Sequence, residues 1–471
     1  MKKMTQRAFA VLLLAVAVIM GMIVYVIRYV DEGRDWALYF ARSNTRSSGR
    51  LLDRNGYDLA YFNGYENLFS EDQQTRIANY HVTGDYWGRT GVGVLASYWS
   101  EMQSFDLVRG TTREQHTTMQ LNIDSYLNRI IYLSLNRLEK PVPRDAEVEP
   151  LLDAYGMPIL DAEGNIVYPE PKVEVPNAAV LVCNYRNGEL LGMVSVPSVD
   201  PMDDVTPPKD GAYINRCLSA SFIPGSVFKL ITAAAAIENL PDIEEMSFYC
   251  EGQDFIAGVP ITCMVPHYTQ NFEQALANSC NCAFAKIAVR LGQDTMIQQV
   301  HNYGFLSRQS LEGIETAAGS YPLTFVGDPE LGWSGIGQST DLICPYNMLR
   351  FVCAIANGGT LLEPKIIRDG QSPVATELVK PSTAAKLKEM MAYTVSYGYN
   401  GEETFDGLPL CGKTGTAELG DGSTHAWFVG FLDDEEHPWA FVTFVEQGGR
   451  GLEVAGAVTK SILKQYISGT G

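Results

Sequence analysis

Ser226 and Lys229 are the first pair in this sequence whose types and spacing suggest covalent catalysis. Residues i and i+3 share one face of a helix, and Pro224-Gly225 places the pair at the beginning of a predicted helix that runs to Leu240. The unpaired backbone N–H groups of a first turn stabilise a developing oxyanion, and a lysine kept neutral by burial accepts the serine proton. The pattern therefore predicts a nucleophilic serine activated by a lysine.

A second copy of the S-x-x-K pattern is present, as expected for a motif with about two chance matches in a chain of this length. It consists of Ser461 and Lys464, lies inside a predicted C-terminal helix over residues 452–467, and has no Gly or Pro before it. We interpret this copy as part of an amphipathic helix. Ser226 therefore stays the candidate nucleophile.

Two further short patterns follow Ser226 along the chain. Ser279 and Asn281 supply a hydroxyl and an amide two residues apart, with Cys280 between them. A cation, hydroxyls and unobstructed backbone then occur together on one predicted strand, at Lys413, Thr414, Gly415 and Thr416. Each pattern is weak alone, but the chain order S-x-x-K, S-x-N, K-T-G is a specific signature of acyl-serine enzymes.

With these three motifs the sequence resembles the class B penicillin-binding proteins, which are monofunctional peptidoglycan D,D-transpeptidases. The resemblance also covers other segments: residues 49–56, 193–198, 336–338, 356–359 and 413–418. It implies an α+β fold of the β-lactamase/D,D-peptidase type, in which helices flank a five-stranded antiparallel sheet and a helical subdomain is inserted. A membrane anchor and a loop-rich pedestal domain would precede that transpeptidase domain.

The resemblance implies a role for each motif residue. Ser226 would attack the penultimate D-Ala carbonyl of a stem pentapeptide, Lys229 would accept its proton, and Ser279 would relay that proton to the departing D-Ala. Asn281 would hold the substrate amide, and Lys413 would keep the site electropositive. The terminal carboxylate of the substrate would bind at the last motif, Thr414, Gly415 and Thr416. Backbone N–H groups of Ser226 and Thr416 would form the oxyanion hole. No metal and no cofactor is expected.

The implied function is a serine D,D-transpeptidase that cross-links peptidoglycan stem peptides and is inhibited covalently by β-lactams. Two alternatives stay open: a β-lactam sensor or silent penicillin-binding protein, and a D,D-carboxypeptidase or β-lactamase that gives the acyl group to water. The expected partners are stem peptides on lipid-linked or nascent glycan and a glycan-polymerising membrane protein. The motifs do not distinguish a role in elongation, division or sporulation.

An apolar run of twenty residues, Ala8 to Ile27, contains no charge and follows Lys2, Lys3 and Arg7. Its length predicts one membrane-spanning helix over residues 8–28, and the basic flank predicts that residues 1–7 stay in the cytoplasm. The catalytic domain would then lie on the extracytoplasmic side of the cell membrane. A cleaved signal peptide is the alternative, although the A-x-A pattern at Ala15 and Ala17 lies in the middle of the run.

Three regions are predicted beyond the anchor: a pedestal domain (29–138), a linker or flap rich in Pro, Asp and Glu (139–176), and the transpeptidase domain (177–471). In the last region, alternation and turn signals predict five strands, at 178–184, 189–196, 411–418, 426–432 and 439–445. Helices are expected at 226–240, 271–291 and 452–467. The resulting architecture is an antiparallel sheet with a large helical insertion.

Composition and other motifs exclude several classes of function. The net charge is −20, so the chain has no broad cationic surface for nucleic acid. H-E-x-x-H and G-x-S-x-G do not occur. Residues 407–414 satisfy the formal pattern of a phosphate-binding loop but lack a buried strand before it and a helix after it.

The nine cysteines are too few, and odd in number, for a disulfide-stapled scaffold. Cys280 and Cys282 are interpreted as small buried residues because no paired histidine suggests a cysteine nucleophile. A disulfide between Cys250 and Cys263 is left open.

Overall fold

The computed structural model describes residues 2–44, 49–63, 66–102, 105–106, 110–111, 117–141, 157–158, 173–323, 327–338, 340–368 and 372–469. Most of the predicted linker, residues 139–176, lies outside the described residues. The predicted conformation of that segment therefore stays a prediction.

A five-stranded antiparallel sheet lies at the centre of the C-terminal region, with the strand order β10-β9-β21-β20-β19. Its strands are β9 (Ala178–Asn184), β10 (Leu190–Val196), β19 (Leu410–Glu418), β20 (Thr424–Leu432) and β21 (Trp439–Val445). All neighbouring pairs are antiparallel. The five-stranded sheet predicted from the sequence is thus confirmed.

Strand alternation divides the side chains of this sheet between two apolar cores. On one face Leu181 and Val429 join a core with α11 (Pro345–Ala356). On the other face Val180 and Phe428 join a core with α14 (Ala457–Gly469). Because both faces are covered, the strands are apolar at almost every position, and little of their surface meets solvent.

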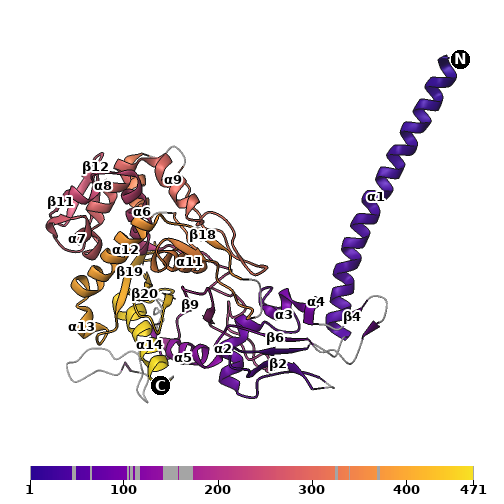
Figure 1. Cartoon of the computed structure of the whole chain (residues 1–471), viewed down its shortest axis with the longest axis horizontal. Coiled ribbons are helices and arrows are strands. Elements are labelled where there is room, and N and C mark those ends of the chain that lie inside the picture. The colour runs from indigo at the N-terminus through magenta and orange to yellow at the C-terminus, as the bar shows by residue number, and fades with distance from the viewer. Residues whose placement is uncertain are drawn as a thin grey trace.

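The helical insertion lies between β10 and β19 in sequence and forms one end of the body in Figure 1. Its helical segments are η1 (Gly225–Phe228), α6 (Lys229–Asn239), η2 (Ile243–Glu245), α7 (Phe272–Ala277), α8 (Asn281–Leu291), α9 (Gln293–Asn302), α10 (Asp328–Ser334), α12 (Pro381–Tyr393), η3 (Thr394–Gly398) and α13 (Gly401–Thr404). Short two-stranded ribbons connect them: β11 (Ser247–Cys250) with β14 (Tyr268–Asn271), β12 (Gln253–Ile256) with β13 (Val259–Thr262), β15 (Ser310–Leu311) with β16 (Ile314–Glu315), and β17 (Thr360–Leu362) with β18 (Ala375–Glu377).

The predicted continuous helix over residues 271–291 is wrong in one respect, because the chain breaks it into α7 and α8. Asn271 caps α7 in a reciprocal capping box with Gln274, and Asn278 ends it. Ser279 then adopts a left-handed backbone with φ 53°, which no helix interior accommodates. This break turns Ser279 and Asn281 out of a helix interior and toward Lys229.

The N-terminal region contains a four-stranded sheet with the order β3-β2-β1-β6. Its strands are β1 (Arg50–Leu52), β2 (Asp58–Phe62), β3 (Asn67–Phe69) and β6 (Thr118–Gln120). The remaining elements before β9 are α2 (Gln73–Thr83), α3 (Val94–Ser97), α4 (Trp99–Met102), β4 (Phe105–Asp106), β5 (Gly110–Thr111), α5 (Ser125–Leu135), β7 (Lys140–Pro141) and β8 (Val173–Glu174).

Helix α5 joins this region to the central sheet. Asp124 caps it by accepting hydrogen bonds from the backbone of Tyr126 and Leu127. Its buried face belongs to the core beneath α14. The Asn128 amide oxygen accepts from the Met193 backbone of β10 at 3.0 Å. Although we assigned α5 to the pedestal, it thus packs against the transpeptidase sheet, and the proposed boundary at residue 138 stays a prediction.

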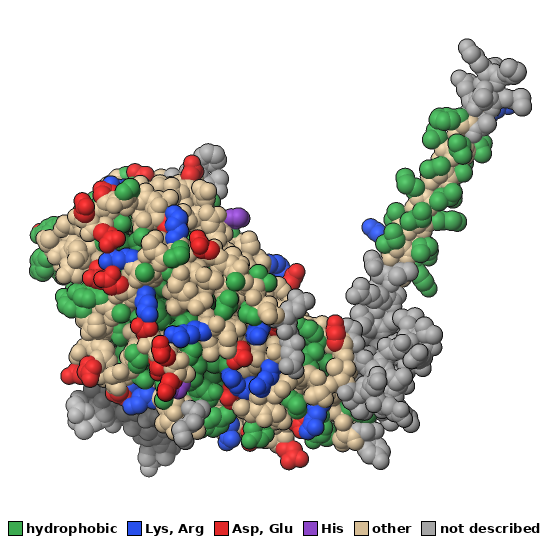
Figure 2. All heavy atoms as spheres, viewed as in Figure 1, with side chains coloured by type: hydrophobic (Ala, Val, Ile, Leu, Met, Phe, Trp, Pro, Cys, Tyr) green, Lys and Arg blue, Asp and Glu red, His purple; other side chains and the backbone are tan. Residues whose placement is uncertain are grey.

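A single long helix, α1 (Lys2–Asn44), projects from the body in Figure 1. Its segment Phe9–Tyr29 is long and apolar enough to cross a membrane, with none of the span buried against the rest of the chain. Figure 2 shows apolar side chains around this helix, whereas charges of both signs cover the visible face of the body. The span agrees within one residue with the predicted 8–28. An apolar helix near the N-terminus also fits a signal sequence, so the anchor stays a prediction.

Candidate active site

Three separate elements bring the three sequence motifs together: the η1–α6 junction, the break before α8, and the edge strand β19. Lys229 Nζ lies at their centre, 3.0 Å from Ser226 Oγ and 3.1 Å from Ser279 Oγ. It also donates to the Asn281 side-chain oxygen at 2.6 Å and to the Ser279 carbonyl at 2.6 Å. The structure therefore unites the S-x-x-K and S-x-N motifs around one amine.

Lys413 approaches the same point from β19. Its Nζ donates to Ser279 Oγ at 3.1 Å and to the Thr414 carbonyl at 2.9 Å. The Ser279 hydroxyl thus lies within hydrogen-bond distance of two lysine amines. A hydroxyl that donates one proton and accepts others is suited to pass a proton between groups on either side.

Both lysine side chains are fully buried, which makes their ammonium forms unfavourable. Burial, followed by the positive charge of Lys413, lowers the pKa of Lys229 to about 7. Burial also lowers the pKa of Lys413 to about 7. None of the described carboxylates is among the causes of either shift. An amine at this site can therefore exchange a proton near neutral pH, as a general base requires.

Two glycines let the backbone of η1 lie directly against β19. A Cβ on Gly225 would lie 2.9 Å from the Thr416 carbonyl oxygen, and Gly225 has φ 56°. A Cβ on Gly415 would lie 2.8 Å from the Pro224 carbonyl oxygen. Any larger side chain at either position would force the two segments apart, and Ser226 with them.

β19 is an edge strand, so alternate backbone groups point away from β20 and toward the site. The Thr414 N–H and C=O both point outward, because they bond Tyr399 and Lys413. A strand repeats its orientation every two residues, which aims the Thr416 N–H toward η1 as well. This direction suits an oxyanion hole built from the N–H groups of Ser226 and Thr416.

Asn281 and Thr416 are both held by hydrogen bonds from the protein, and the Asn281 amide is bonded at its oxygen by Lys229 and at its nitrogen by Thr262. Asn281 Nδ2 donates to the Thr262 carbonyl at 2.7 Å, and Thr416 Oγ1 accepts from the Gly451 backbone at 3.1 Å. Each side chain keeps further hydrogen-bonding capacity for a substrate amide or carboxylate. Thr416 lies on the face opposite Gly415, as strand alternation predicts.

Tyr399, at the end of η3, is a site residue that the sequence analysis missed. Its hydroxyl accepts from the Thr414 backbone at 2.9 Å, bonds Thr414 Oγ1 at 2.9 Å, and lies 3.5 Å from Lys413 Nζ. Burial raises its pKa to about 12, so it stays a neutral phenol. No spacing or motif links Tyr399 to the K-T-G strand, and only the tertiary fold brings them together.

The structure explains why the second S-x-x-K copy and the formal phosphate-binding pattern are chance matches. Lys464 on α14 is bonded to Asp406 at 2.6 Å, and Ser461 accepts from Gln465. Lys413 lies inside β19, and the next element is the strand β20, so no helix follows the formal phosphate-binding pattern. Both structures agree with the sequence interpretation.

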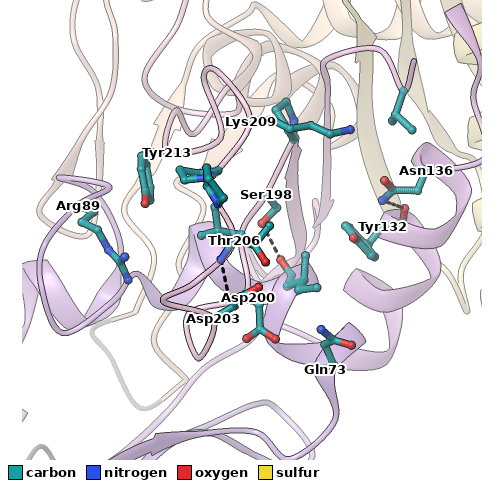
Figure 3. A pocket seen from close by; sticks show the side chains of 16 residues that line it. Gln73, Arg89, Tyr132, Asn136, Ser198, Asp200, Asp203, Thr206, Lys209 and Tyr213 are labelled. Atoms are coloured by element: carbon teal, nitrogen blue, oxygen red, sulfur yellow. Dashed lines mark hydrogen bonds between the residues drawn. The ribbon is translucent and has the colours of Figure 1, made fainter. Parts of the chain in front are cut away.

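A pocket of about 270 Å³ lies elsewhere, between the N-terminal region and the loop after β10, and none of the three motifs lines it. Figure 3 shows its polar lining, which includes Gln73, Asp203 and Lys209. Its Arg89 is already paired with Asp85 at 2.9 Å. The pocket contains no nucleophile with an adjacent base, so it offers no alternative centre for the chemistry.

All nine cysteines are unoxidised in the structure, so Cys250 and Cys263 form no disulfide. Cys280 and Cys282 are buried, in agreement with their interpretation as small interior residues. Cys280 nevertheless belongs to a polar cluster that the sequence analysis did not detect, which is described below.

Comparison with known proteins gives matches that agree with this geometry. Residues 178–464 match the family model described as the penicillin binding protein transpeptidase domain. Stage V sporulation protein D of Bacillus subtilis is 28% identical over 62% of this chain and 49% of its own length. Peptidoglycan D,D-transpeptidase PbpA of Mycolicibacterium smegmatis is 26% identical over 59% of this chain and 63% of its own. These matches thus span about half to just under two thirds of the curated relatives' length.

The fold also has close counterparts among solved structures. Penicillin-binding protein A of M. tuberculosis, solved as a ceftriaxone acyl-enzyme complex, superimposes with a TM-score of 0.68. The alignment covers 89% of this chain and 98% of that one, at 20% identity. At this identity the likeness establishes the fold, including the region before the central sheet.

Proposed function

This chain belongs to the penicillin-binding protein transpeptidase family, and we propose that it is a serine D,D-transpeptidase that cross-links the stem peptides of peptidoglycan. The same serine would react with β-lactams, whose ring carbonyl would accept it in place of the D-Ala–D-Ala carbonyl. Two similar proteins support this assignment: PbpA of Mycolicibacterium smegmatis, which is named a peptidoglycan D,D-transpeptidase, and penicillin-binding protein A of M. tuberculosis, which was solved as an acyl-enzyme complex.

The acylation step uses Ser226 and Lys229. Neutral Lys229 Nζ takes the proton of Ser226 Oγ while that oxygen bonds the penultimate D-Ala carbonyl carbon. The backbone N–H groups of Ser226 and Thr416 stabilise the oxyanion. When the C–N bond to the terminal D-Ala breaks, Ser279 passes the proton from Lys229 to the departing amine.

The second step resolves the ester. The amine of a neighbouring stem peptide attacks the acyl carbon, its proton returns through the same lysine and serine, and Ser226 is released with a new peptide cross-link. Lys413 and the hydroxyls of Thr414 and Thr416 bind the substrate carboxylate, and Asn281 binds the substrate amide.

One observation carries the proposal: Lys229 Nζ lies 3.0 Å from Ser226 Oγ and is fully buried. A solvated lysine has a pKa near 10.4 and could not act as a base at neutral pH. The pKa of about 7 produced by burial and by Lys413 removes that obstacle.

The test is acyl transfer by the purified full chain in detergent, using a stem-peptide donor with a D-Ala–D-Ala terminus and a labelled D-amino acid as acceptor. We expect exchange of the terminal D-Ala for the acceptor and a penicillin adduct on Ser226. Release of D-Ala to water alone would indicate a carboxypeptidase. Penicillin labelling without turnover of any donor peptide would indicate a silent binding protein or sensor.

Helix α1 supports a proposal for the location of the protein. We propose that Phe9–Tyr29 spans the cell membrane once, with residues 1–7 in the cytoplasm and the catalytic domain outside. A glycan-polymerising membrane protein would supply the nascent strands as partner. A single cysteine introduced after Gly33 should react with an impermeant maleimide on intact cells, and one near Met1 should not. Mature protein that begins near residue 18 and leaves the membrane would overturn the anchor.

A further inference from the structure

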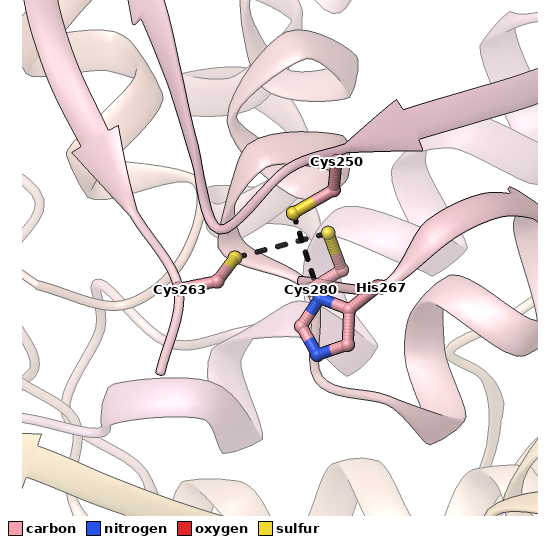
Figure 4. A group of neighbouring side chains, drawn as sticks. All are labelled: Cys250, Cys263, His267 and Cys280. Carbon is pink, nitrogen blue, oxygen red and sulfur yellow. Dashed lines mark hydrogen bonds between the residues drawn. The ribbon is translucent and has the colours of Figure 1, made fainter. Parts of the chain in front are cut away.

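Four potential metal ligands meet directly behind the S-x-N motif: Cys250, Cys263, His267 and Cys280. Their ligand atoms all lie within 4.8 Å of one another, and Figure 4 shows the side chains converging. Cys250 ends β11, Cys263 follows β13, His267 precedes β14, and Cys280 is the N-cap of α8. Three chain segments therefore meet at one point, and the connection between β13 and β14 contributes two of the four side chains.

The separations fit a shared ion, and the cysteines are free thiols in the structure. The sulfurs of Cys263 and Cys280 are 3.9 Å apart, and Cys250 Sγ lies 3.6 Å from His267 Nδ1. Zinc bonds of about 2.3 Å to sulfur and about 2.0 Å to nitrogen place neighbouring ligands about 3.5–3.8 Å apart in a tetrahedron. A disulfide would need its sulfurs at about 2.05 Å.

The surroundings of the cluster suit thiolates. The Gly252 N–H donates to Cys250 Sγ at 3.4 Å, and the Asn281 N–H donates to Cys263 Sγ at 3.2 Å. Backbone donors of this kind stabilise negatively charged sulfur and orient it toward a metal. Cys250 and Cys280 are buried, while Cys263 and His267 are only partly exposed, so solvent access to the four atoms is limited.

The ribbons around the cluster are short, and Phe248 and Ile261 anchor them in the main apolar core. β11 pairs only with β14, and β12 only with β13, in two-stranded ribbons of four residues per strand. Isolated ribbons of this size are at best marginally stable in water. Three of the four ligands lie at the ends of these ribbons, and the fourth lies on the loop between α7 and α8. A metal bound there would tie the ribbons to the catalytic loop.

We propose that Cys250, Cys263, His267 and Cys280 bind one zinc ion at a closed tetrahedral site beside the catalytic centre. Three thiolates and one imidazole form a common ligand set of structural zinc, and all four positions are filled by protein. Binding would release the three thiol protons to solvent. The ion would carry out no step of acyl transfer.

The role of the ion would be to position the S-x-N loop. Cys280 lies between Ser279 and Asn281, and the Asn281 N–H bonds Cys263. Ser279 has φ 53°, a left-handed conformation that is unfavourable for a non-glycine residue and persists only where neighbouring contacts enforce it. Zinc bonds to Cys280 on one side and hydrogen bonds to Lys229 and Lys413 on the other would hold Ser279 in place.

The first experiment uses inductively coupled plasma mass spectrometry to measure the metal content of the full chain, purified in detergent without chelators. We expect about one zinc per chain, retained on dialysis. Cys250→Ala and Cys263→Ala should each lose at least tenfold in zinc content. Two matched controls should keep it. One is Cys217→Ala, a buried cysteine whose sulfur donates to backbone carbonyls of β9 and β10. The other is Cys282→Ala, whose sulfur lies 3.6 Å from Cys263 but outside the four-atom group.

A second pair of variants separates loss of metal from loss of folding. His267→Ala should lose zinc, whereas His267→Cys should keep it, because four thiolates also bind zinc tetrahedrally. Cobalt exchanged into wild type and His267→Cys should give thiolate charge-transfer absorption, and cobalt added to His267→Ala should not. The proposed site would be overturned if purified wild-type protein contained no metal and circular dichroism showed it to be folded. Full zinc occupancy in Cys250→Ala would also overturn it. These measurements use no β-lactam and no peptide, so their result is independent of the proposed transpeptidase activity.

Discussion

Two regions of this chain carry the same S-x-x-K pattern and differ in almost every physical property. At the η1–α6 junction, Lys229 is fully buried and donates to Ser226 at 3.0 Å. On α14, the Lys464 side chain is half exposed, and it bonds Asp406 instead of Ser461. Spacing alone therefore brings a serine and a lysine to one helix face, but burial and neighbouring charge decide whether the amine can act as a base.

The difference shows how the fold turns a common pattern into a reactive one. The α14 pair has water and a carboxylate to stabilise its ammonium group, as surface lysines normally do. The η1–α6 pair has Lys413 and apolar walls, which favour the neutral amine and lower the pKa of Lys229 to about 7.

The largest effect is expected for the nucleophile. Ser226→Ala should abolish covalent labelling by fluorescent penicillin, because the ester requires that oxygen. Ser461→Ala should label at the wild-type rate. In-gel fluorescence measures the covalent labelling, and circular dichroism checks that each variant is folded. Labelling that persists in Ser226→Ala would show that another residue is acylated, and peptide mass spectrometry would locate it.

The next effect concerns the base. Lys229→Arg keeps a positive charge but cannot deprotonate, so we expect the acylation rate constant to fall at least about 10²-fold. Lys464→Arg should leave the rate unchanged. Stopped-flow acylation by a chromogenic cephalosporin measures both. A Lys229→Arg rate within about threefold of wild type would assign proton abstraction to another group, with Ser279 the next candidate.

The pH dependence tests the cause of the lowered pKa. Lys229 acts as a base only when neutral, so the acylation rate should rise with pH and level off above its pKa of about 7. Lys413→Met removes the neighbouring positive charge, which should move the midpoint of that profile to higher pH. Lys464→Met should not move it. A midpoint that is the same in Lys413→Met would leave burial as the only cause.

A smaller effect is expected at Tyr399, which bonds the Thr414 backbone beside Lys413. Tyr399→Phe keeps the ring but leaves the part-buried Thr414 N–H without this acceptor. The free energy of unfolding should fall by about 1–3 kcal/mol. Denaturant unfolding measures this change, with Tyr397→Phe, an exposed tyrosine nearby, as the control. Equal stability of the two variants would mean that water replaces the phenol.

The smallest effect is expected on the surface of α14. Asp406→Ala removes the ion pairs with Lys460 and Lys464, which are exposed to solvent. Such pairs contribute little to stability, so thermal unfolding and acylation should both stay close to wild type. A large loss of acylation would indicate that α14 is coupled to the site.

Sequence alone determined the features that depend on local chemistry or short periods. Alternation and turn signals located all five strands of the central sheet, and β21 agrees residue for residue with the predicted 439–445. The apolar run located the candidate membrane span, and the order of the three motifs selected Ser226 over Ser461. The strands, the span and each motif are local patterns, and motif order is read directly from the chain, which is why a single sequence could supply them.

Only the tertiary structure decided features that depend on contacts between distant segments. The break at Ser279 arises because its backbone is held left-handed between α7 and α8, where composition alone favours one helix. Tyr399 reaches Thr414 because η3 packs against β19. The proposed zinc site forms because Cys250 and Cys280 meet the loop that carries Cys263 and His267. Burial of Lys229 likewise depends on what surrounds it, because a pKa reflects the desolvation and charges of a folded neighbourhood and not the identity of the residue.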